Sequence, residues 1–598
     1  MTANFWTTRR RKAGLLILAG IATLLLFLLF FINSLLSPLI ARKIKSAVLK
    51  GSDGLYQVTF SKLDLNIFTG KAVLEDVKLI ADTGRSQAVS QLYSGSAKEI
   101  LVSGAHPFEF WFHKKLEIGQ ITITSPVVSL VVLKAPVAKV KKEQTVYQQL
   151  SGSVKSIHVG GIDLVDVQLS YQDVSEKYRL KELSLVATDL LIDYATQKDT
   201  TRTLFCRDIT TGIRNFSGVS ADGTYHYRLR SARFSTRSEK LTVRGMVLQP
   251  LPTGAFFAKT KADRFTFALD SMVLDRFNYK SFQLDHFLEV KRLYAFKGSI
   301  GIFSNPDGLL ARTDRVVTFP NYIIRTLKTH FNVDTLDLTG FEVSYSEFNK
   351  KPARTGTITF EDTKARFLNI SNQPAELKVN PHCTAALSTS FMGRGKLDLH
   401  FVFNLTDKVY AYSYQGHLAA MPLDAVNQAV MPLALVKIKS GTLKSMDFAV
   451  SSTRKTSTGT LKLLYNDFDI ALLDRNYHEK PVKTLLTNML VVSKDNPDGN
   501  SALPRFAKIV FIRPKNDPFF ETLWATLFSG IKPCAGIGYA VKPDPGKPLS
   551  KKEQKAKAKA LEQAVKAKKK ADKQYQKQLK KQAGKSGNRA GKNNSGVS

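Results

Sequence analysis

The chain has 598 residues, and 43% of them are hydrophobic, which is enough to build a folded body of several domains. Its three cysteines are too few and too scattered for a disulfide framework or a zinc site of the CxxC type. The formal net charge of +37 indicates anionic partners, such as nucleic acid, lipid headgroups or an anionic envelope polymer.

The N-terminus has the pattern of a membrane anchor. Residues 1–12 end in the basic run "RRRK", and twenty uncharged residues follow from Ala13 to Ile32. A helix of that length spans roughly 30 Å of hydrocarbon, so we predict a transmembrane helix over residues 13–35. The basic flank favours a cytoplasmic N-terminus, although Arg42 and Lys43 follow soon after the span and weaken the charge asymmetry.

Residues 36–55 continue the apolar run with interspersed lysines, as in "LLSPLIARKIKSAVL". Lysine side chains at such positions extend toward headgroups while their stems cover apolar surface. We therefore expect a juxtamembrane amphipathic helix here.

Residues 56–500 change to a period of two. Stretches such as "QVTFSKLDLNI", "DRFTFALDSMVL" and "GTLKLLYNDFDIALL" alternate apolar and polar residues and are separated by Gly, Asn, Asp and Pro. This pattern predicts a mainly β, antiparallel, elongated body with short helices, and it argues against a doubly wound α/β scaffold.

One segment of this body occurs twice, as "VGGIDLVDVQLSY" from Val159 and "VDTLDLTGFEVSY" from Val333. In each copy the apolar alternation changes phase after two intervening residues, which is the pattern of a β-bulge that returns apolar side chains to one face. A third copy, "IGQITITSPVVSL" from Ile118, places Pro126 near the expected bulge.

These features resemble the AsmA-like envelope proteins of Gram-negative bacteria. The resemblance is carried by the N-terminal anchor leading into "YQVTFSKLDLNIFTGKAVLEDVKLIAD", by "ITITSPVVSL", and by the late segment "YSYQGHLAAMPLDAVNQAVMPLALVKIKSGTLKSMDFAV". It implies a single-pass inner-membrane protein with a periplasmic β-rich body, and a part in envelope biogenesis, outer-membrane assembly or phospholipid transport. No cofactor is expected.

The apolar strand faces can be buried in two ways. They can pack against a second sheet in a sandwich, or the array can curl into a groove whose apolar lining holds lipid tails. In the groove alternative, the repeated segment supplies the residues that face lipid: Ile162, Leu164, Val167, Leu169, Leu336, Leu338, Phe341 and Val343.

Catalytic motifs are missing from the sequence. There is no HExxH, GxSxG or phosphate-binding GxxxxGK[ST] pattern, and His382 and Cys383 are neighbours whose side chains point to opposite faces of a strand. We therefore expect no enzyme, no catalytic residues and no metal site.

Residues 501–538 contain an amphipathic helix, expected from Asp517 as N-cap and Pro518 at the first position to Gly530 as the stop. Docking on the β body is one alternative for its apolar face, and contact with a membrane or a partner helix is the other. We expect that face to comprise Phe519, Phe520, Leu523, Trp524, Leu527 and Phe528.

Residues 539–598 are rich in Lys, Ala, Gln and Gly and carry almost no apolar side chains, so we expect a disordered basic tail. The tail either binds anionic lipid or an envelope polymer, or it serves as a solubilising segment. The lysines expected to meet an anionic surface are Lys551, Lys552, Lys568, Lys569, Lys570, Lys580 and Lys581.

Three functions follow from these patterns. The first is phospholipid handling or transport between membranes through an apolar groove, and the second is a non-enzymatic envelope scaffold with a closed β body and no lipid cargo. Both allow further envelope proteins as partners. The third, nucleic-acid binding, is disfavoured because the basic residues are not interleaved with aromatics on a recognisable nucleic-acid module.

Overall fold

The computed structural model describes residues 36–82, 84, 91–132, 147, 152, 154–172, 177–260, 262–304, 314–350, 352–480, 492–499 and 503–536. These residues all belong to one compact unit, residues 1–485 with 492–537. The predicted transmembrane helix and the basic tail lie outside them. Among the described helices, none is long and apolar enough to cross a membrane.

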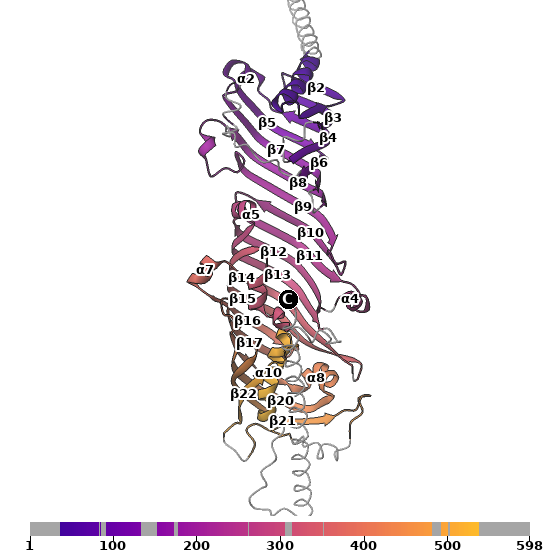
Figure 1. Ribbon diagram of the computed structural model, residues 1–598, viewed down its shortest axis with the longest axis vertical. Coiled ribbons are helices and arrows are strands. Elements are labelled where there is room, and N and C mark those ends of the chain that lie inside the picture. The colour runs from indigo at the N-terminus through magenta and orange to yellow at the C-terminus, as the bar shows by residue number, and fades with distance from the viewer. Residues whose placement is uncertain are drawn as a thin grey trace, which may run out of the picture. The chain divides into compact units, whose positions relative to one another are not determined.

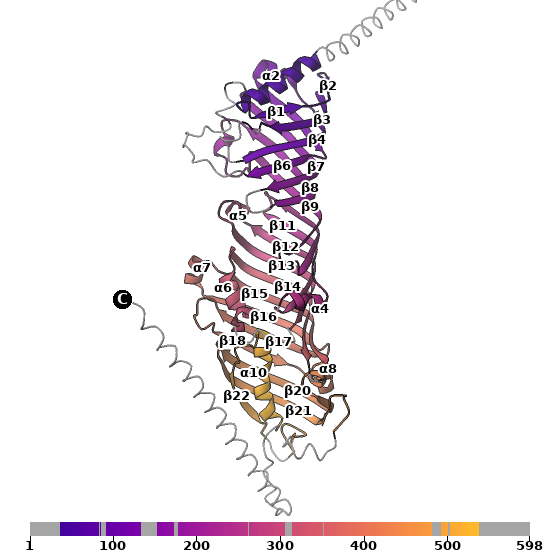
Figure 2. The ribbon, with the colours of Figure 1, turned by 45° about the vertical axis from the view of Figure 1, so that its right-hand side comes forward.

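The described strands form one large, mostly antiparallel sheet, which confirms the mainly β prediction. Figures 1 and 2 show the strands following one another along the sheet in chain order. Three pairings, β5 with β7, β6 with β7 and β13 with β14, are parallel and divide the sheet into three antiparallel blocks.

The first block comprises β1 (Tyr56–Thr59), β2 (Lys62–Asn66), β3 (Lys71–Ala81), β4 (Gln91–Ser103), β5 (Lys115–Thr124) and β6 (Val127–Val132). The second comprises β7 (Ser156–Gln172), β8 (Lys177–Ile192), β9 (Cys206–Val219), β10 (Tyr225–Ser235), β11 (Lys240–Pro250), β12 (Arg264–Phe277) and β13 (Phe287–Phe303). The third comprises β14 (His330–Asn349), β15 (Arg354–Ser371), β16 (His382–Phe391), β17 (Gly395–Asn404), β18 (Tyr412–Leu418), β19 (Met421–Pro422), β20 (Val436–Ser452), β21 (Thr456–Leu472) and β22 (Phe506–Ile512).

Short helices occupy the connections, and residues 36–51 are helical ahead of β1. The others are α2 (Pro107–His113), η2 (Thr196–Lys198), α4 (Thr253–Lys259), α5 (Tyr279–Asp285), η3 (Arg315–Thr318), α6 (Pro320–Thr326), α7 (Pro374–Val379), η4 (Leu423–Val426), α8 (Asn427–Ala434) and α10 (Phe519–Cys534).

The repeated segment opens a new block each time. The first copy forms most of β7 and the second most of β14, and each lies parallel to a strand of the preceding block. The register shifts next to Val167 and Phe341 confirm the predicted bulges. In the third copy Pro126, which has no backbone N–H, separates β5 from β6, so the strand breaks where a bulge was expected.

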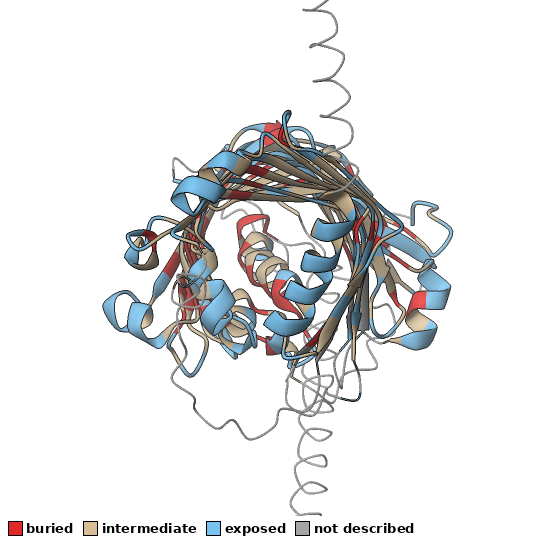
Figure 3. Cartoon of the chain, turned by 90° about the horizontal axis from the view of Figure 1, so that it is seen from above, coloured by how far each residue is buried: buried red, intermediate tan, exposed pale blue. Residues whose placement is uncertain are grey.

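The bulges of β7 and β14 lie on a seam of left-handed backbone angles that crosses the sheet. Left-handed backbone angles recur at neighbouring positions of β7, β8, β9, β11, β13, β14 and β15, at Asp166, Glu182, Asn215, Gly245, Lys297, Gly340 and Asp362. A bulge bends its strand and increases the local twist, so the bulges of β7 and β14 contribute to the curl of the sheet. Viewed end-on in Figure 3, the strands trace an open curl with a helix inside it.

Candidate functional site

The eight residues expected to face lipid lie on one face of the sheet. In β7, Ile162 and Leu164 lie opposite Ala187 and Leu185, and beyond the bulge Val167 lies opposite Leu183. Without the bulge Val167 would lie on the opposite face from Leu164, because side chains alternate along a strand. The second copy repeats this arrangement, with Leu336, Leu338, Phe341 and Val343 opposite Phe367, Ala365, Thr363 and Phe360.

This apolar face is continuous between the two copies. Every strand of the second block adds apolar side chains to it, while the alternate residues of each strand are mostly exposed on the other face. One row of cross-strand partners runs through Leu164, Leu185, Thr211, Phe234, Leu241, Leu274, Leu293 and Leu336.

Over the second block, the described helices reach this face at its rims. Its buried clusters are built from side chains of neighbouring strands, such as Leu269, Ala295 and Phe341, with Tyr279 of α5 at one rim. At another rim Phe256 of α4 is fully buried, and its ring lies 5.5 Å from that of Tyr225. All described strands belong to the same sheet, so no second sheet among the described residues packs on this face. Most of its apolar side chains are accordingly half-buried rather than buried.

Over the third block, helices cover the same face. Phe319, between η3 and α6, is fully buried with Phe401, Phe403 and Tyr412, and α10 adds Phe519 and Cys534 to this cluster. Figure 2 shows α10 lying across the strands of this block. The helices η3, α6 and α10 therefore cover the apolar face at its C-terminal end, and they do not extend over the second block.

The docked face of α10 differs from the predicted one. Pro518 is the N-cap residue, and no side chain caps the helix, so the prediction of Asp517 as N-cap is wrong. Gly530 lies inside the helix, which continues to Cys534, so the prediction of Gly530 as the stop is wrong. A Cβ at Gly530 would come within 2.9 Å of Ile509 and 3.1 Å of Leu461, so this contact requires a glycine. The glycine permits close helix packing and does not end the helix.

The six predicted apolar residues of α10 divide between two stripes. Phe519, Leu523 and Leu527 pack on the sheet together with Thr522, Thr526 and Ile531. Phe520, Trp524 and Phe528 form the second stripe, where the Trp524 and Phe528 rings stack at 5.8 Å and Phe520 lies 5.8 Å from the Tyr345 ring. Docking of α10 thus leaves an aromatic stripe beside β14.

A buried arginine fixes the start of α10. The Arg513 side chain, 2% exposed, is ion-paired with Asp314 and donates hydrogen bonds to the carbonyl oxygens of Arg454 at 2.6 Å and Asp517 at 2.8 Å. The Phe519 amide also donates to Thr318 Oγ1 at 2.9 Å. The helix is therefore tied to η3, far away in the sequence.

Three carboxylates lie beside this contact. Burial, and to a lesser extent Asp517 and Glu347, raise the pKa of Glu521 to about 8, although Arg315 opposes the shift. Burial and Asp517 also raise the pKa of Glu347, and burial raises the pKa of Asp517 against the influence of Arg513. Such clustered acids favour protonation, because a buried negative charge next to others is costly.

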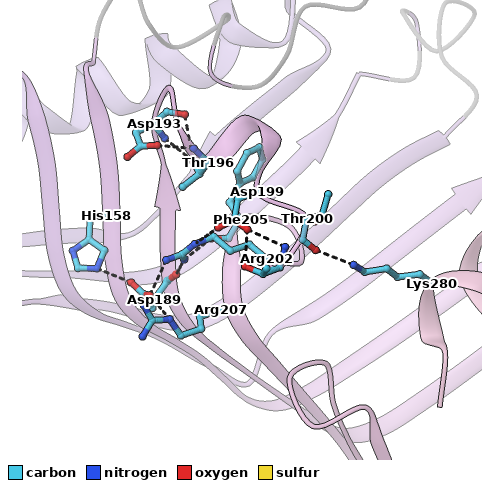
Figure 4. A network of polar contacts seen from close by, with 11 residues as sticks. His158, Asp189, Asp193, Thr196, Asp199, Thr200, Arg202, Phe205, Arg207 and Lys280 are labelled. Atoms are coloured by element: carbon cyan, nitrogen blue, oxygen red, sulfur yellow. Dashed lines mark hydrogen bonds and ion pairs between the residues drawn. The ribbon is translucent and has the colours of Figure 1, made fainter. Parts of the chain in front are cut away.

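A polar network lies at the rim of the second block (Figure 4). His158 on β7 hydrogen-bonds through Nδ1 to Glu117 at 2.8 Å and through Nε2 to Asp189 at 3.1 Å. Asp189 also pairs with Arg202 and Arg207, each at 3.0 Å. The pKa of the Asp189 carboxyl is lowered, since these partners outweigh its burial. Charged side chains therefore border the apolar face at this rim of the sheet.

The opposite, polar face of the sheet carries a hollow of about 1310 Å³ across β13 to β22. Tyr294 and Phe296 stand at one end and Phe506 at the other, with charged side chains such as Lys364, Arg366 and Asp398 between them. No residue of α10 lines this hollow, although Leu338 of the apolar face contributes to its lining.

His382 and Cys383, the one His/Cys pair singled out in the sequence, do not form a shared site in the described part of the chain. His382 is exposed while Cys383 is buried, and burial raises the pKa of the Cys383 thiol to about 12. No group of three metal-ligating side chains comes together among the described residues. The tail lysines from Lys551 to Lys581 lie outside the described residues.

One surface was missed from the sequence. The helix α2, "PFEFWFH", has no buried residue and four exposed aromatic side chains. The sequence pattern that could have indicated this helix is a proline followed by several aromatic residues, without the alternation of a strand.

Comparison of the sequence with models of protein families and with curated proteins finds no match.

Proposed function

We propose that the chain is a membrane-anchored, non-enzymatic envelope protein that handles phospholipid, with acyl chains held against the apolar face of its curled sheet. The observation that carries this proposal is the continuous apolar face from β7 to β14, which no second sheet covers among the described residues. A half-buried apolar surface of this extent is unfavourable in water and becomes favourable when hydrocarbon covers it.

The anchor and its topology belong to the same proposal. The uncharged run from Ala13 to Ile32 supports a membrane anchor, and the basic residues before it favour a cytoplasmic N-terminus with the body outside the inner membrane. The AsmA-like resemblance supports a periplasmic location and transfer of lipid between membranes.

Neighbouring positions on β8 provide a sharp test. Leu185 lies on the apolar face opposite Leu164, while Val186 lies on the other face and is 39% exposed. We would replace each with the photo-crosslinking residue p-benzoylphenylalanine in the full chain and irradiate intact cells. Phospholipid attached from position 185 and absent from position 186 is the expected result. Equal or no attachment from both positions would overturn the proposal.

Scaffolding without lipid cargo is the second candidate. It is favoured by the helices η3, α6 and α10, which bury the apolar face over the third block as a closed core would. On that reading the face over the second block meets protein, and position 185 attaches to protein instead of lipid.

A further inference from the structure

We propose that α2 is a second membrane contact, an aromatic wedge that inserts into the surface of the bilayer and seats the N-terminal edge of the sheet on it. This rests on the proposed function only in taking the chain to be membrane-anchored. The occupant is a phospholipid bilayer with anionic headgroups.

A surface helix usually turns its apolar side chains toward the core, but in α2 the aromatic side chains face solvent and no residue is buried. Trp111 is 73% exposed and Phe112 is 78% exposed, with Phe108 and Phe110 also exposed, while the polar Glu109 and His113 pair with each other at 3.0 Å. A seven-residue helix gains little stability from its own hydrogen bonds, so solvent-exposed aromatics on it indicate a partner that is absent.

The neighbouring turn enlarges the aromatic surface. Phe68, 54% exposed, lies in the turn between β2 and β3, two residues before Gly70. Gly70 has a left-handed φ of 61°, and a Cβ there would meet the Ala105 carbonyl oxygen at 2.1 Å. The turn is therefore packed tightly against the residues that lead into α2, and the two segments form one surface.

Charge and chain connectivity identify the occupant. Lys114 and Lys115 directly follow α2, and Lys155 donates its backbone N–H to the Lys114 carbonyl oxygen at 2.8 Å; all three side chains are exposed. Aromatic side chains flanked by lysines are typical of membrane interfaces, where rings enter the headgroup region and lysines meet anionic lipid. The nearby carboxylate Glu117 is already bonded to His158.

If residues 13–35 span a membrane as predicted, the bilayer surface lies near the start of the described chain. The apolar run ends at Ile32, and the described chain begins at residue 36 with a helix whose exposed side chains include Leu39, Arg42 and Lys43. In Figures 1 and 2 this helix and α2 lie at the same end of the sheet. A bilayer met by the one is therefore close to the other.

The experiment uses the three tryptophans of the chain, Trp6, Trp111 and Trp524. A full-chain variant with Trp6→Phe and Trp524→Phe retains only Trp111 and is reconstituted in vesicles containing anionic phospholipid. Replacing part of the lipid with acyl-brominated phospholipid should reduce its fluorescence by more than half. Vesicles without anionic lipid should give weaker quenching, and equal quenching in both would overturn the role of the lysines.

The matched control places a tryptophan at the other edge of the sheet. Val510 on β22 is 70% exposed, close to the exposure of Trp111. Val510→Trp in a chain that lacks the three native tryptophans should remain unquenched. Emission of Trp111 that is as unquenched as that of the control would overturn the proposal. Lipid attachment at Leu185 is measured separately, so failure of α2 insertion and failure of lipid handling are distinguishable.

Discussion

The buried Arg513 and the half-buried Asp314 form an ion pair between segments that lie on either side of the third block in the sequence. The Arg513 guanidinium lies 5.2 Å from the Phe319 ring, so its charge is enclosed by an aromatic face and by carbonyl oxygens. This arrangement couples the position of α10 to η3. The ion pair therefore adds to the core packing and to the Phe519–Thr318 hydrogen bond that hold α10 over the apolar face.

We expect Arg513→Ala to lower the free energy of unfolding by about 1–3 kcal/mol, because it leaves the Arg454 and Asp517 carbonyl oxygens and the half-buried Asp314 carboxylate without their donor. Lys494→Ala is the control: Lys494 and Asp467 pair at 3.3 Å with both side chains more than 70% exposed, and such pairs contribute about 0–1 kcal/mol. Chemical denaturation of both variants in the same detergent gives the comparison. Similar losses from the two changes would contradict a special role of the Arg513 side chain.

Glu521 should make stability depend on pH. The unfolded chain ionises this group near its ordinary pKa of 4.5, whereas the folded chain does so near 8. Between these values the folded state keeps a proton that the unfolded state has released, so Glu521 reduces stability progressively as the pH rises from 4.5 to 8.

Glu521→Gln should remove this dependence. The variant should be more stable than the parent at pH 8.5, by on the order of 1–2 kcal/mol, and nearly equal to it at pH 4.5. Thermal unfolding across this pH range measures the difference. The exposed Glu376 of α7, changed to Gln, should leave the profile of the parent unaltered. A constant gap at all pH values would show that the gain has another origin.

The strands and the bulges of β7 and β14 could be predicted from the sequence, but which strands pair with each other could not. The change of phase around Leu164 and Val167 is local, and a period of two leaves few ways to keep both on one face. The parallel pairing of β7 with β5 depends on contacts across a long connection, which no local pattern encodes. For this reason the division of the sheet into three antiparallel blocks was not predicted.

The helix α10 shows a different limit. Its existence followed from the apolar pattern, but its end was misplaced because glycine is the usual residue after a helix. Gly530 lies inside the helix, at a contact where Ile509 and Leu461 leave no room for a side chain. Tertiary packing thus decides which of two ordinary roles a glycine takes.

The bulge seam should be sensitive at Gly340, where φ is +70°. An added Cβ would meet nothing closer than Lys297 Cγ at 3.7 Å, so backbone strain rather than crowding should cause the loss. We expect Gly340→Ala to cost about 1–2 kcal/mol. Gly254→Ala in α4, with open space around it, should be neutral or slightly stabilising. Equal unfolding midpoints for the two would argue against strain at the seam.

The apolar face itself should tolerate charge only where it is half-buried. Leu169 and Val343 lie on this face with part of their surface exposed, whereas Phe341, two residues before Val343 on β14, is 2% exposed. An aspartate at Phe341 would be enclosed without a partner and should cost several kcal/mol, enough to unfold the chain.

Leu169→Asp and Val343→Asp should instead give folded, membrane-anchored and protease-resistant protein, because the carboxylate can reach water over the open face. Both should lose phospholipid that co-purifies with the parent, since a charge there opposes acyl-chain contact. Limited proteolysis and mass spectrometry of extracted lipid measure the two properties on one preparation. If all three aspartate variants are degraded alike, the face is closed against a partner layer, and scaffolding becomes the better account. If Leu169→Asp and Val343→Asp survive with their lipid intact, the acyl chains lie elsewhere.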